Sequence, residues 1–185
     1  GDPYYYNLMP NLMYKNMGGS KFADVSMSGG FAHLQKGHGV SFADFDFDGD
    51  LDVYSVMGGA YVGDPAYNTL FENPGFGNHW LCVQLVGTDS NRSGIGARIH
   101  AVITENGKTR SVYRHVNSGG SFGANPLRQT IGMGTASKID LLEIHWPRTG
   151  KTQTFQDVTP DRMVRITEGS DEIETVTAKK TTIGG

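Results

Sequence analysis

The chain has 185 residues, of which 37% are hydrophobic and 10% aromatic, a composition that excludes wholesale disorder and suits one domain or two small ones. Its formal net charge of −3 offers no basic footprint for nucleic acid, and no apolar run approaches the roughly 20 residues that span a bilayer. The 26 glycines follow no collagen period, so they indicate many tight turns and an all-β chain.

Short β-favouring runs recur between turn residues along the chain. The run at 97–104 partly alternates, with Ala97, Ile99, Ala101 and Ile103 on one face, as in a half-buried strand. Asn106 and Gly107 then supply the turn chemistry of a hairpin. We expect strands at residues 12–15, 21–25, 40–45, 51–56, 69–72, 80–86, 97–104, 109–116, 127–131, 139–146, 152–155 and 163–167.

An imperfect repeat occupies the first 80 residues. Residues 11–16 resemble residues 68–73, and residues 1–3 resemble residues 63–65. A period near 60 built from short strands indicates stacked or radial β units, such as propeller blades. Little more than one unit is present, and such units need neighbours, so we expect upstream blades as partners. The alternative is a chance similarity between two Asn-rich turns.

The residue pattern of the sequence changes near residue 78, where the expected strands become longer and the acidic repeat disappears. We therefore predict a terminal repeat region at 1–77 and a second β domain at 78–168. Residues 169–185 are polar and Thr-rich, which predicts a tail or linker. The lone Cys82 excludes an intrachain disulfide and is expected to pack as a small buried hydrophobe.

Five aspartates within nine positions carry the strongest chemical signal. Each close pair of carboxylates costs roughly 1 kcal/mol in a water-like dielectric, so a chain keeps such a cluster mainly when a cation binds it. All-oxygen ligation by several carboxylates favours Ca²⁺ over zinc, copper or magnesium. The predicted ligands are Asp44, Asp46, Asp48, Asp50 and Asp52.

The spacing fits a loop that wraps one ion. Positions 1, 3 and 5 place their side chains on one centre, and Gly49 permits the sharp turn. Asp50 at position 7 is expected to give its backbone carbonyl, and Asp52 at position 9 closes the shell. An EF-hand begins in the same way, but it needs a glutamate where this chain has Ser55, and it needs flanking helices. The flanks here are strand-like. We expect structural rather than catalytic calcium in a β-hairpin; the alternative is a solvated acidic turn without metal.

Other motifs are weaker. Residues 119–123 satisfy the pattern G-x-S-x-G, which leaves a hydrolase with Ser121 as nucleophile as the enzyme alternative. The Gly-rich stretches at 91–96 and 118–123 match no nucleotide-binding pattern. Six histidines show no paired ligand spacing. Trp80 and Trp146 are either core residues or, if exposed together, a platform for a sugar.

On the basis of these residues, the chain resembles bacterial FG-GAP/VCBS-repeat proteins that end in an ASPIC/UnbV domain. This group is similar to cartilage acidic protein. Residues 39–53 resemble the calcium hairpin of the repeat, and residues 68–73 resemble the strand that closes a blade. The ASPIC/UnbV signature is resembled by residues 78–81, 91–98, 118–122, 139–147 and 161–162.

The resemblance implies a partial β-propeller with an FG-GAP-type blade, followed by a β-sandwich-like ASPIC/UnbV domain. It also implies an extracellular, periplasmic or cell-surface location and a calcium-dependent role in binding or adhesion, without established catalytic residues. We therefore expect a non-enzymatic, calcium-stabilised scaffold for a protein or carbohydrate ligand, within a larger exported protein. A purely structural adaptor that docks onto the missing blades is the remaining alternative.

Overall fold

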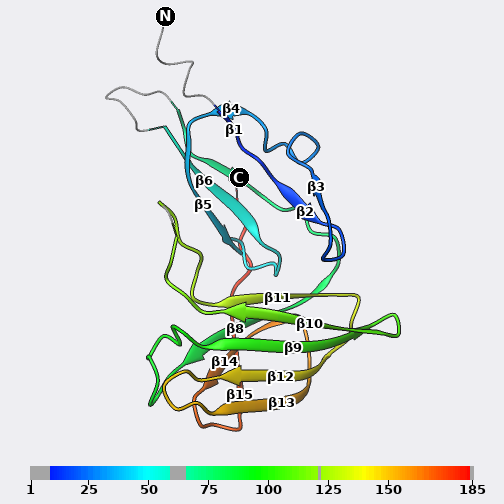
Figure 1. Cartoon of the computed structure of the whole chain (residues 1–185), viewed down its shortest axis with the longest axis vertical. Coiled ribbons are helices and arrows are strands. Elements are labelled where there is room, and N and C mark those ends of the chain that lie inside the picture. Colours follow the sequence, from blue (N-terminus) through cyan, green and yellow to red (C-terminus); the bar gives the residue numbers. More distant parts are fainter. Residues whose placement is uncertain (1–8, 59–65, 121, 184–185) are drawn as a thin grey trace, which may run out of the picture. The chain divides into compact units, whose positions relative to one another are not determined.

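The computed structural model describes residues 9–58, 66–120 and 122–183, and all regular structure in these ranges is β-strand (Figure 1). The predicted all-β class is confirmed. Within the same ranges, no helix is long and apolar enough to cross a membrane. The chain divides into two compact units, one drawn from residues 1–41, 53–71 and 120–124 and the other from 42–52, 72–119 and 125–185.

The first unit consists of small sheets. Strand β1 (Met9–Pro10) pairs with β4 (Leu34–Gln35), and β2 (Tyr14–Asn16) pairs with β3 (Phe22–Asp24). A three-stranded sheet has the order β5 (Gly37–Ala43), β6 (Asp52–Met57) and β7 (Thr69–Phe71). The described residues form neither a closed barrel nor a propeller, so the predicted blade remains a prediction.

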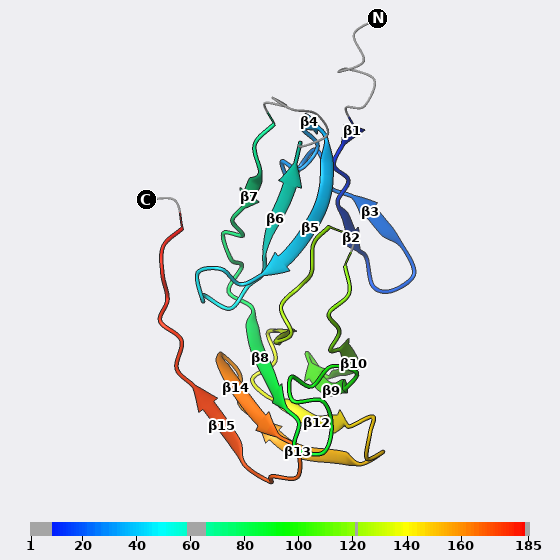
Figure 2. The same cartoon turned by 90° about the vertical axis from the view of Figure 1, so that its left-hand side faces the viewer.

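The second unit contains two four-stranded sheets, seen as two layers in Figure 2. One has the order β10 (Lys108–His115), β9 (Arg98–Glu105), β12 (Ile139–His145) and β13 (Thr152–Val158). The other has the order β11 (Gln129–Gly134), β8 (His79–Val86), β14 (Arg162–Thr167) and β15 (Ile173–Val176). Neighbouring strands are antiparallel, except that β14 runs parallel to β8.

One cluster of buried side chains joins the two sheets. The predicted inward face of β9 is confirmed, because Ala97, Ile99, Ala101 and Ile103 are at most 1% exposed. Leu81 and Val83 of β8 and Val164 and Ile166 of β14 complete the cluster from the other sheet. Burial of such side chains stabilises each by about 1.5–3 kcal/mol relative to leaving it exposed, so this cluster is the main source of stability in the unit.

The predicted hairpin between β9 and β10 is also confirmed. Lys108 lies opposite Glu105, and the two residues between them have positive φ, 51° at Asn106 and 73° at Gly107. Such angles match the right-handed twist of the flanking strands. The turn therefore fixes the pairing register of both strands.

A buried carboxylate organises the loop after β8. Oε2 of Glu168 accepts hydrogen bonds from the N–H groups of Thr88, Asp89 and Ser90 at 3.0, 3.0 and 2.7 Å. Oε1 accepts from the hydroxyls of Ser90 at 2.8 Å and Thr149 at 3.1 Å. Although burial raises the pKa of Glu168, these hydrogen bonds outweigh it and lower the pKa to about 2.

All twelve predicted strands overlap an observed strand, but the division of the chain differs from the expectation. Residues 42–52 join the second unit, although they lie in the predicted repeat region. Strand β15 lies in the segment predicted as a polar tail and pairs with β14 from Met163↔Val176 to Ile166↔Ile173. Ile173 packs against the shared core, which explains why so polar a segment forms a strand.

Candidate metal centre

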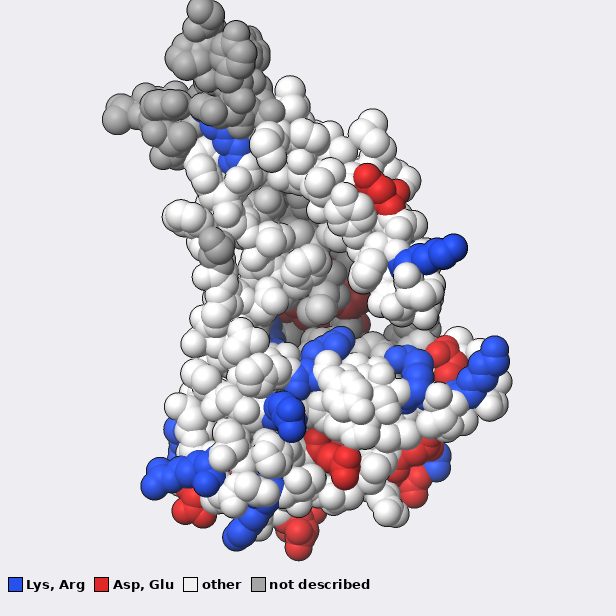
Figure 3. Space-filling model, in the orientation of Figure 1, with Lys and Arg blue, Asp and Glu red and all other residues white. Residues whose placement is uncertain are grey.

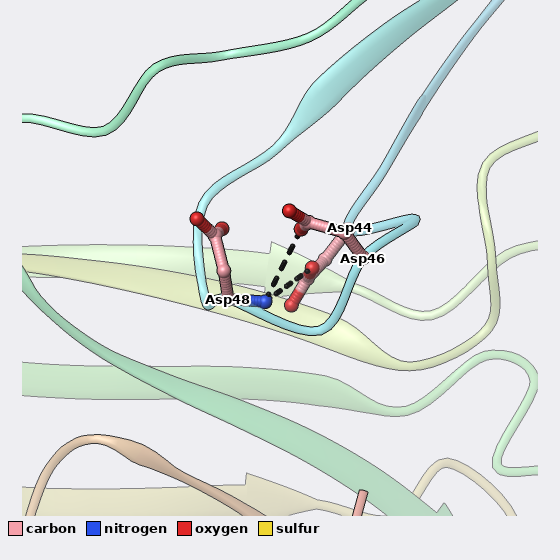
Figure 4. A group of neighbouring side chains, drawn as sticks. All are labelled: Asp44, Asp46 and Asp48. Atoms are coloured by element: carbon pink, nitrogen blue, oxygen red, sulfur yellow. Dashed lines mark hydrogen bonds between the residues drawn. The ribbon is translucent and has the colours of Figure 1, made fainter. Parts of the chain in front are cut away.

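The acidic loop (residues 44–52) connects β5 to β6 and folds back on its own carboxylates. Oδ1 of Asp44 accepts the N–H of Asp48 at 3.1 Å, and Oδ2 accepts the N–H of Gly49 at 3.1 Å. Oδ1 of Asp46 also accepts the N–H of Asp48 at 3.3 Å (Figure 4). Short side chains that bond to backbone N–H groups just downstream produce such turns. The sequence thus closes the loop locally.

Three of the five predicted ligands come together. One oxygen from each of Asp44, Asp46 and Asp48 lies within 4.8 Å of the others. Asp44 and Asp46 are only 5% and 6% exposed. Burial raises the pKa of Asp44, and the charge of Asp46 adds to the rise, although backbone N–H groups act in the opposite direction. A cation between the three carboxylates would relieve both the burial and the repulsion.

Asp50 is not part of that group of three, but it carries a buried oxygen without a partner. Its Oδ1 accepts no hydrogen bond from the described residues. Burial, followed by repulsion from Asp48 and Asp52, raises the pKa of Asp50 to about 6. A buried polar atom without a partner destabilises the fold by about 1–3 kcal/mol, and bound cations are one way in which proteins satisfy such atoms. The acidic loop therefore fits a hard cation.

Asp52 lies outside the group of three, and backbone donors hold its carboxylate in place. It is 1% exposed, and both of its oxygens accept backbone N–H groups, Oδ2 from Phe45 at 3.0 Å and Oδ1 from Asn73 at 2.9 Å. The amide of Asn73 donates in turn to the carbonyl of Leu51 at 3.4 Å. Asp52 thus ties the base of the acidic loop to the chain that follows β7.

The sharp turn predicted at Gly49 has two causes. Gly49 has φ of 102°, a conformation that side chains disfavour. In addition, a Cβ atom at this position would lie 1.8 Å from Nε1 of Trp80. The sequence indicates the turn, whereas the contact with Trp80 depends on tertiary structure and could not be predicted.

Further contacts hold the acidic loop within the second unit. The guanidinium of Arg128 lies 5.1 Å from the ring centre of Phe47, and its Nη2 donates to the carbonyl of Asp44 at 3.2 Å. Near the C-terminus, the N–H of Thr181 donates to the carbonyl of Asp46 at 2.8 Å, and Nζ of Lys180 lies 3.3 Å from Oδ2 of Asp48. An ion in the acidic loop would therefore stabilise the second unit as well as the loop itself.

Of the remaining predictions, Ser121 lies outside the described residues. Cys82 and Trp146 are buried at 2% and 1% exposure. Trp80 is half-buried against Gly49, so the two tryptophans form no shared exposed platform. His100, by contrast, has partners that the spacing of the histidines did not indicate.

The sequence did not predict a set of polar contacts that joins β10, β9 and β12. Nδ1 of His100 lies 2.8 Å from Oε2 of Glu143, and Nε2 lies 3.0 Å from Oγ of Ser111. The ring of His100 stacks on Tyr113 with centroids 4.5 Å apart and planes 5° apart. The alternation of the strands indicated that His100 faces outward, but only the register across strands brings these partners together.

Comparison with known families supports part of the resemblance. Residues 87–173 match the family model described as ASPIC and UnbV. The matched range begins at the end of β8 and ends at the start of β15, so most of it lies in the second unit. No curated protein matches the chain. The ASPIC/UnbV part of the prediction is confirmed, and the FG-GAP/VCBS part remains a prediction.

Proposed function

We propose that this chain, in which an ASPIC/UnbV domain is present, is a calcium-stabilised, non-enzymatic recognition segment of a larger exported bacterial protein. Calcium binds in the acidic loop and holds it in one conformation. The ligand of the segment is a protein or a carbohydrate outside the cell.

The convergence of Asp44, Asp46 and Asp48 carries this proposal. One carboxylate oxygen from each of them lies within 4.8 Å of the others, and two of the residues are buried. Two unit charges at about 4 Å interact with roughly 4 kcal/mol at the effective dielectric near a protein surface. Ca²⁺ prefers six to eight oxygen ligands in flexible geometry, which suits a loop that also offers Asp50 and backbone carbonyls.

The acidic loop contacts the β domain, and this gives calcium a role beyond the loop. Gly49 lies against Trp80, and Arg128 binds the loop through Phe47 and Asp44. A bound ion reduces the freedom of the loop before any ligand arrives. Because ordering a surface in advance lowers the entropy loss on binding, calcium makes the segment a better binding surface.

An extracellular, periplasmic or cell-surface location fits the expected affinity. Calcium sites of extracellular modules bind with dissociation constants of about 0.1–1 mM, close to the calcium concentrations outside cells. The family resemblance supports export and an FG-GAP-type blade upstream of the acidic loop. These parts of the proposal are independent of the metal geometry.

Thermal unfolding with calcium or EDTA tests the metal step. A ligand at about 50 times its dissociation constant stabilises the folded state by roughly 2 kcal/mol, which raises Tm by about 5 °C for a protein of this size. We expect this rise in 5 mM Ca²⁺, a much smaller rise in Mg²⁺, and none in Asp46→Asn.

Asp171→Asn is the matched control, because Asp171 is exposed and lies outside the acidic loop. It should respond to calcium as the unmodified chain does. A Tm that stays the same between EDTA and 5 mM Ca²⁺ would contradict the metal step, and so would an equal rise in Asp46→Asn.

The structural adaptor is a second candidate, favoured by the apolar side chains that the first unit exposes. Its buried hydrophobic residues among the described ones are Val53 and Met57. The exposed large hydrophobic residues of its N-terminal part are Met9, Leu12, Tyr14, Met17, Phe22, Met27 and Leu34. If these side chains form one contiguous patch, it would mark an interaction site, and neighbouring blades would cover it.

Binding of an apolar dye tests the adaptor. The native chain should enhance the fluorescence of anilinonaphthalene sulfonate, and the double variant Leu12→Ser with Phe22→Ser should do so less at an unchanged Tm. Absence of dye binding by the native chain would eliminate this candidate. The hydrolase alternative stays a prediction, because Ser121 lies outside the described residues.

A further inference from the structure

We propose that the outer face of β12, β9 and β10 binds an acidic saccharide, with Arg98 holding the anionic group and Tyr113 packing against the sugar ring. This inference rests on the proposed recognition function, but not on its calcium step. The six residues that form this surface, named here the histidine–arginine face, are Arg98, His100, Tyr113, His115, Glu143 and His145.

Strand register places these residues in two neighbouring rows. In the first row, Arg98 lies opposite His115 on β10 and opposite His145 on β12. In the second row, His100 lies opposite Tyr113 and Glu143. The rows are two residues apart along each strand, so all six side chains stand on one face of the sheet. That face is opposite to the one that carries Ile99 and Ile144 into the core.

The histidine of the second row finds its partners within the sheet. Glu143 is the acid on the histidine–arginine face, and it lies 2.8 Å from Nδ1 of His100. Oγ of Ser111 lies 3.0 Å from the other ring nitrogen of His100, Nε2. Tyr113 stacks on His100 in nearly parallel planes yet remains 67% exposed. Stacking on His100 restricts the tyrosine ring and leaves much of its surface open.

The first row lacks an anion. Among the described residues, neither the guanidinium of Arg98 nor the ring of His115 makes a hydrogen bond or an ion pair. Within the described part of the chain, the one hydrogen-bond partner of the His145 ring is Oγ1 of Thr152, at 3.5 Å. The charge of Arg98 therefore has no acidic partner in its own row. An anion from solution would supply the missing partner.

The surface is also hollowed. The histidine–arginine face lines a groove of about 590 Å³, within the range of about 300–1,000 Å³ that is usual for small-ligand sites. Figure 3 looks onto this sheet and shows Lys and Arg atoms beside a broad uncharged area. A guanidinium can bind the two oxygens of a carboxylate or a sulfate at once. The exposed ring of Tyr113 offers a large, rigid contact area at low entropic cost.

These features together favour a sugar that carries a carboxylate or a sulfate. One unpaired arginine is too little for a nucleic acid, which needs an extended basic surface. The guanidinium of Arg98, which has no acidic partner in its row, favours an anionic ligand over an apolar peptide. A pyranose ring can place its C–H face on Tyr113 while its anionic substituent reaches Arg98, and its hydroxyls can bond to Ser111 and Thr152.

Calorimetry with defined oligosaccharides tests the proposal on the full chain. The probes are an oligogalacturonate, a sulfated dextran oligosaccharide and neutral maltohexaose. We expect at least one acidic probe to bind at least 10-fold more tightly than maltohexaose. Arg98→Gln should weaken that binding at least 10-fold, Arg98→Lys should weaken it less, and Tyr113→Ala should weaken it at least fivefold.

Arg110→Gln is the matched control, because it makes the same charge change on the neighbouring strand β10 but on the opposite face of the sheet. It should alter binding less than twofold. Absence of binding by both acidic probes would overturn the proposal, and so would equal losses in Arg98→Gln and Arg110→Gln. Tm values of the variants verify that each one folds.

Titrations in Ca²⁺ and in EDTA separate this proposal from the metal step. Saccharide binding without any calcium-induced rise in Tm would leave the histidine–arginine face standing and would contradict the acidic loop as a metal site. A calcium-induced rise without saccharide binding would do the reverse.

Discussion

The carboxylate of Glu168 gives the sharpest prediction about stability. It is 7% exposed and accepts three backbone N–H groups and two hydroxyls from the loops at 88–90 and 149. Glu168→Gln keeps the shape, because the amide oxygen can accept the N–H groups and the NH₂ can donate to the two hydroxyls. The variant therefore removes the charge and little else.

The size of the effect follows from charge-assisted hydrogen bonding. Hydrogen bonds to charged groups contribute about 1.5–3 kcal/mol, compared with about 0.5–1.5 for neutral ones. The pKa of Glu168, lowered from 4.5 to about 2, likewise shows that the folded state favours the charged carboxylate. Allowing for solvent screening, we expect Glu168→Gln to lower the free energy of unfolding by about 2 kcal/mol at pH 7.

The pH dependence is the more specific test. Since the pKa is lower in the folded state, the stabilisation is fully present above pH 4.5 and is lost as the pH falls toward 2. Glutamine mimics the protonated acid, so the difference between the chain and Glu168→Gln should shrink over that range. Urea unfolding at pH 7, 5 and 3 measures this difference.

Glu174→Gln serves as the control. Glu174 forms an exposed ion pair with Arg165 at 3.1 Å, and such pairs contribute at most about 1 kcal/mol. Equal stabilities of Glu168→Gln and the unmodified chain at pH 7 would refute the reasoning, as would a difference of 2 kcal/mol that persisted at pH 3.

Three further predictions concern the acidic loop. Asp50→Asn should raise Tm in EDTA, because it removes a repelled and buried charge, yet weaken calcium binding in calorimetry; a lower Tm in EDTA would contradict this. Lys180→Met should tighten calcium binding about two- to fivefold, since an exposed ion pair contributes about 0.2–1 kcal/mol; unchanged or weaker binding would count against a role for the ammonium group. Gly49→Ala should destabilise the fold by about 3 kcal/mol through its positive φ and the clash with Trp80, whereas Gly132→Ala, which meets nothing within 4 Å, should have little effect in the same urea unfolding assay.

The sequence predicted those features that depend on neighbouring residues. Alternation at 97–103 identified the buried face of β9, and Asn106 with Gly107 identified the hairpin. The spacing of Asp44, Asp46 and Asp48 predicted their convergence, because positions two apart in a tight loop can point to one centre.

Features that depend on distant residues were not predictable. Asp52 accepts the N–H of Asn73, which lies 21 residues later in the chain. Glu168 reaches a loop some 80 residues earlier in the chain. The partners of His100 come from two other strands. Periodicity shows which face a residue occupies, but it does not show which strand lies beside it.

Terbium luminescence tests the metal site most directly. Tb³⁺ occupies calcium sites, and the indole of Trp80, which lies against Gly49 of the acidic loop, can transfer excitation to it. We expect terbium emission on tryptophan excitation, its suppression by added Ca²⁺, and its loss in Asp44→Asn and Asp46→Asn. Emission that is equally strong in both variants, or no emission from the unmodified chain, would contradict a metal site in this loop.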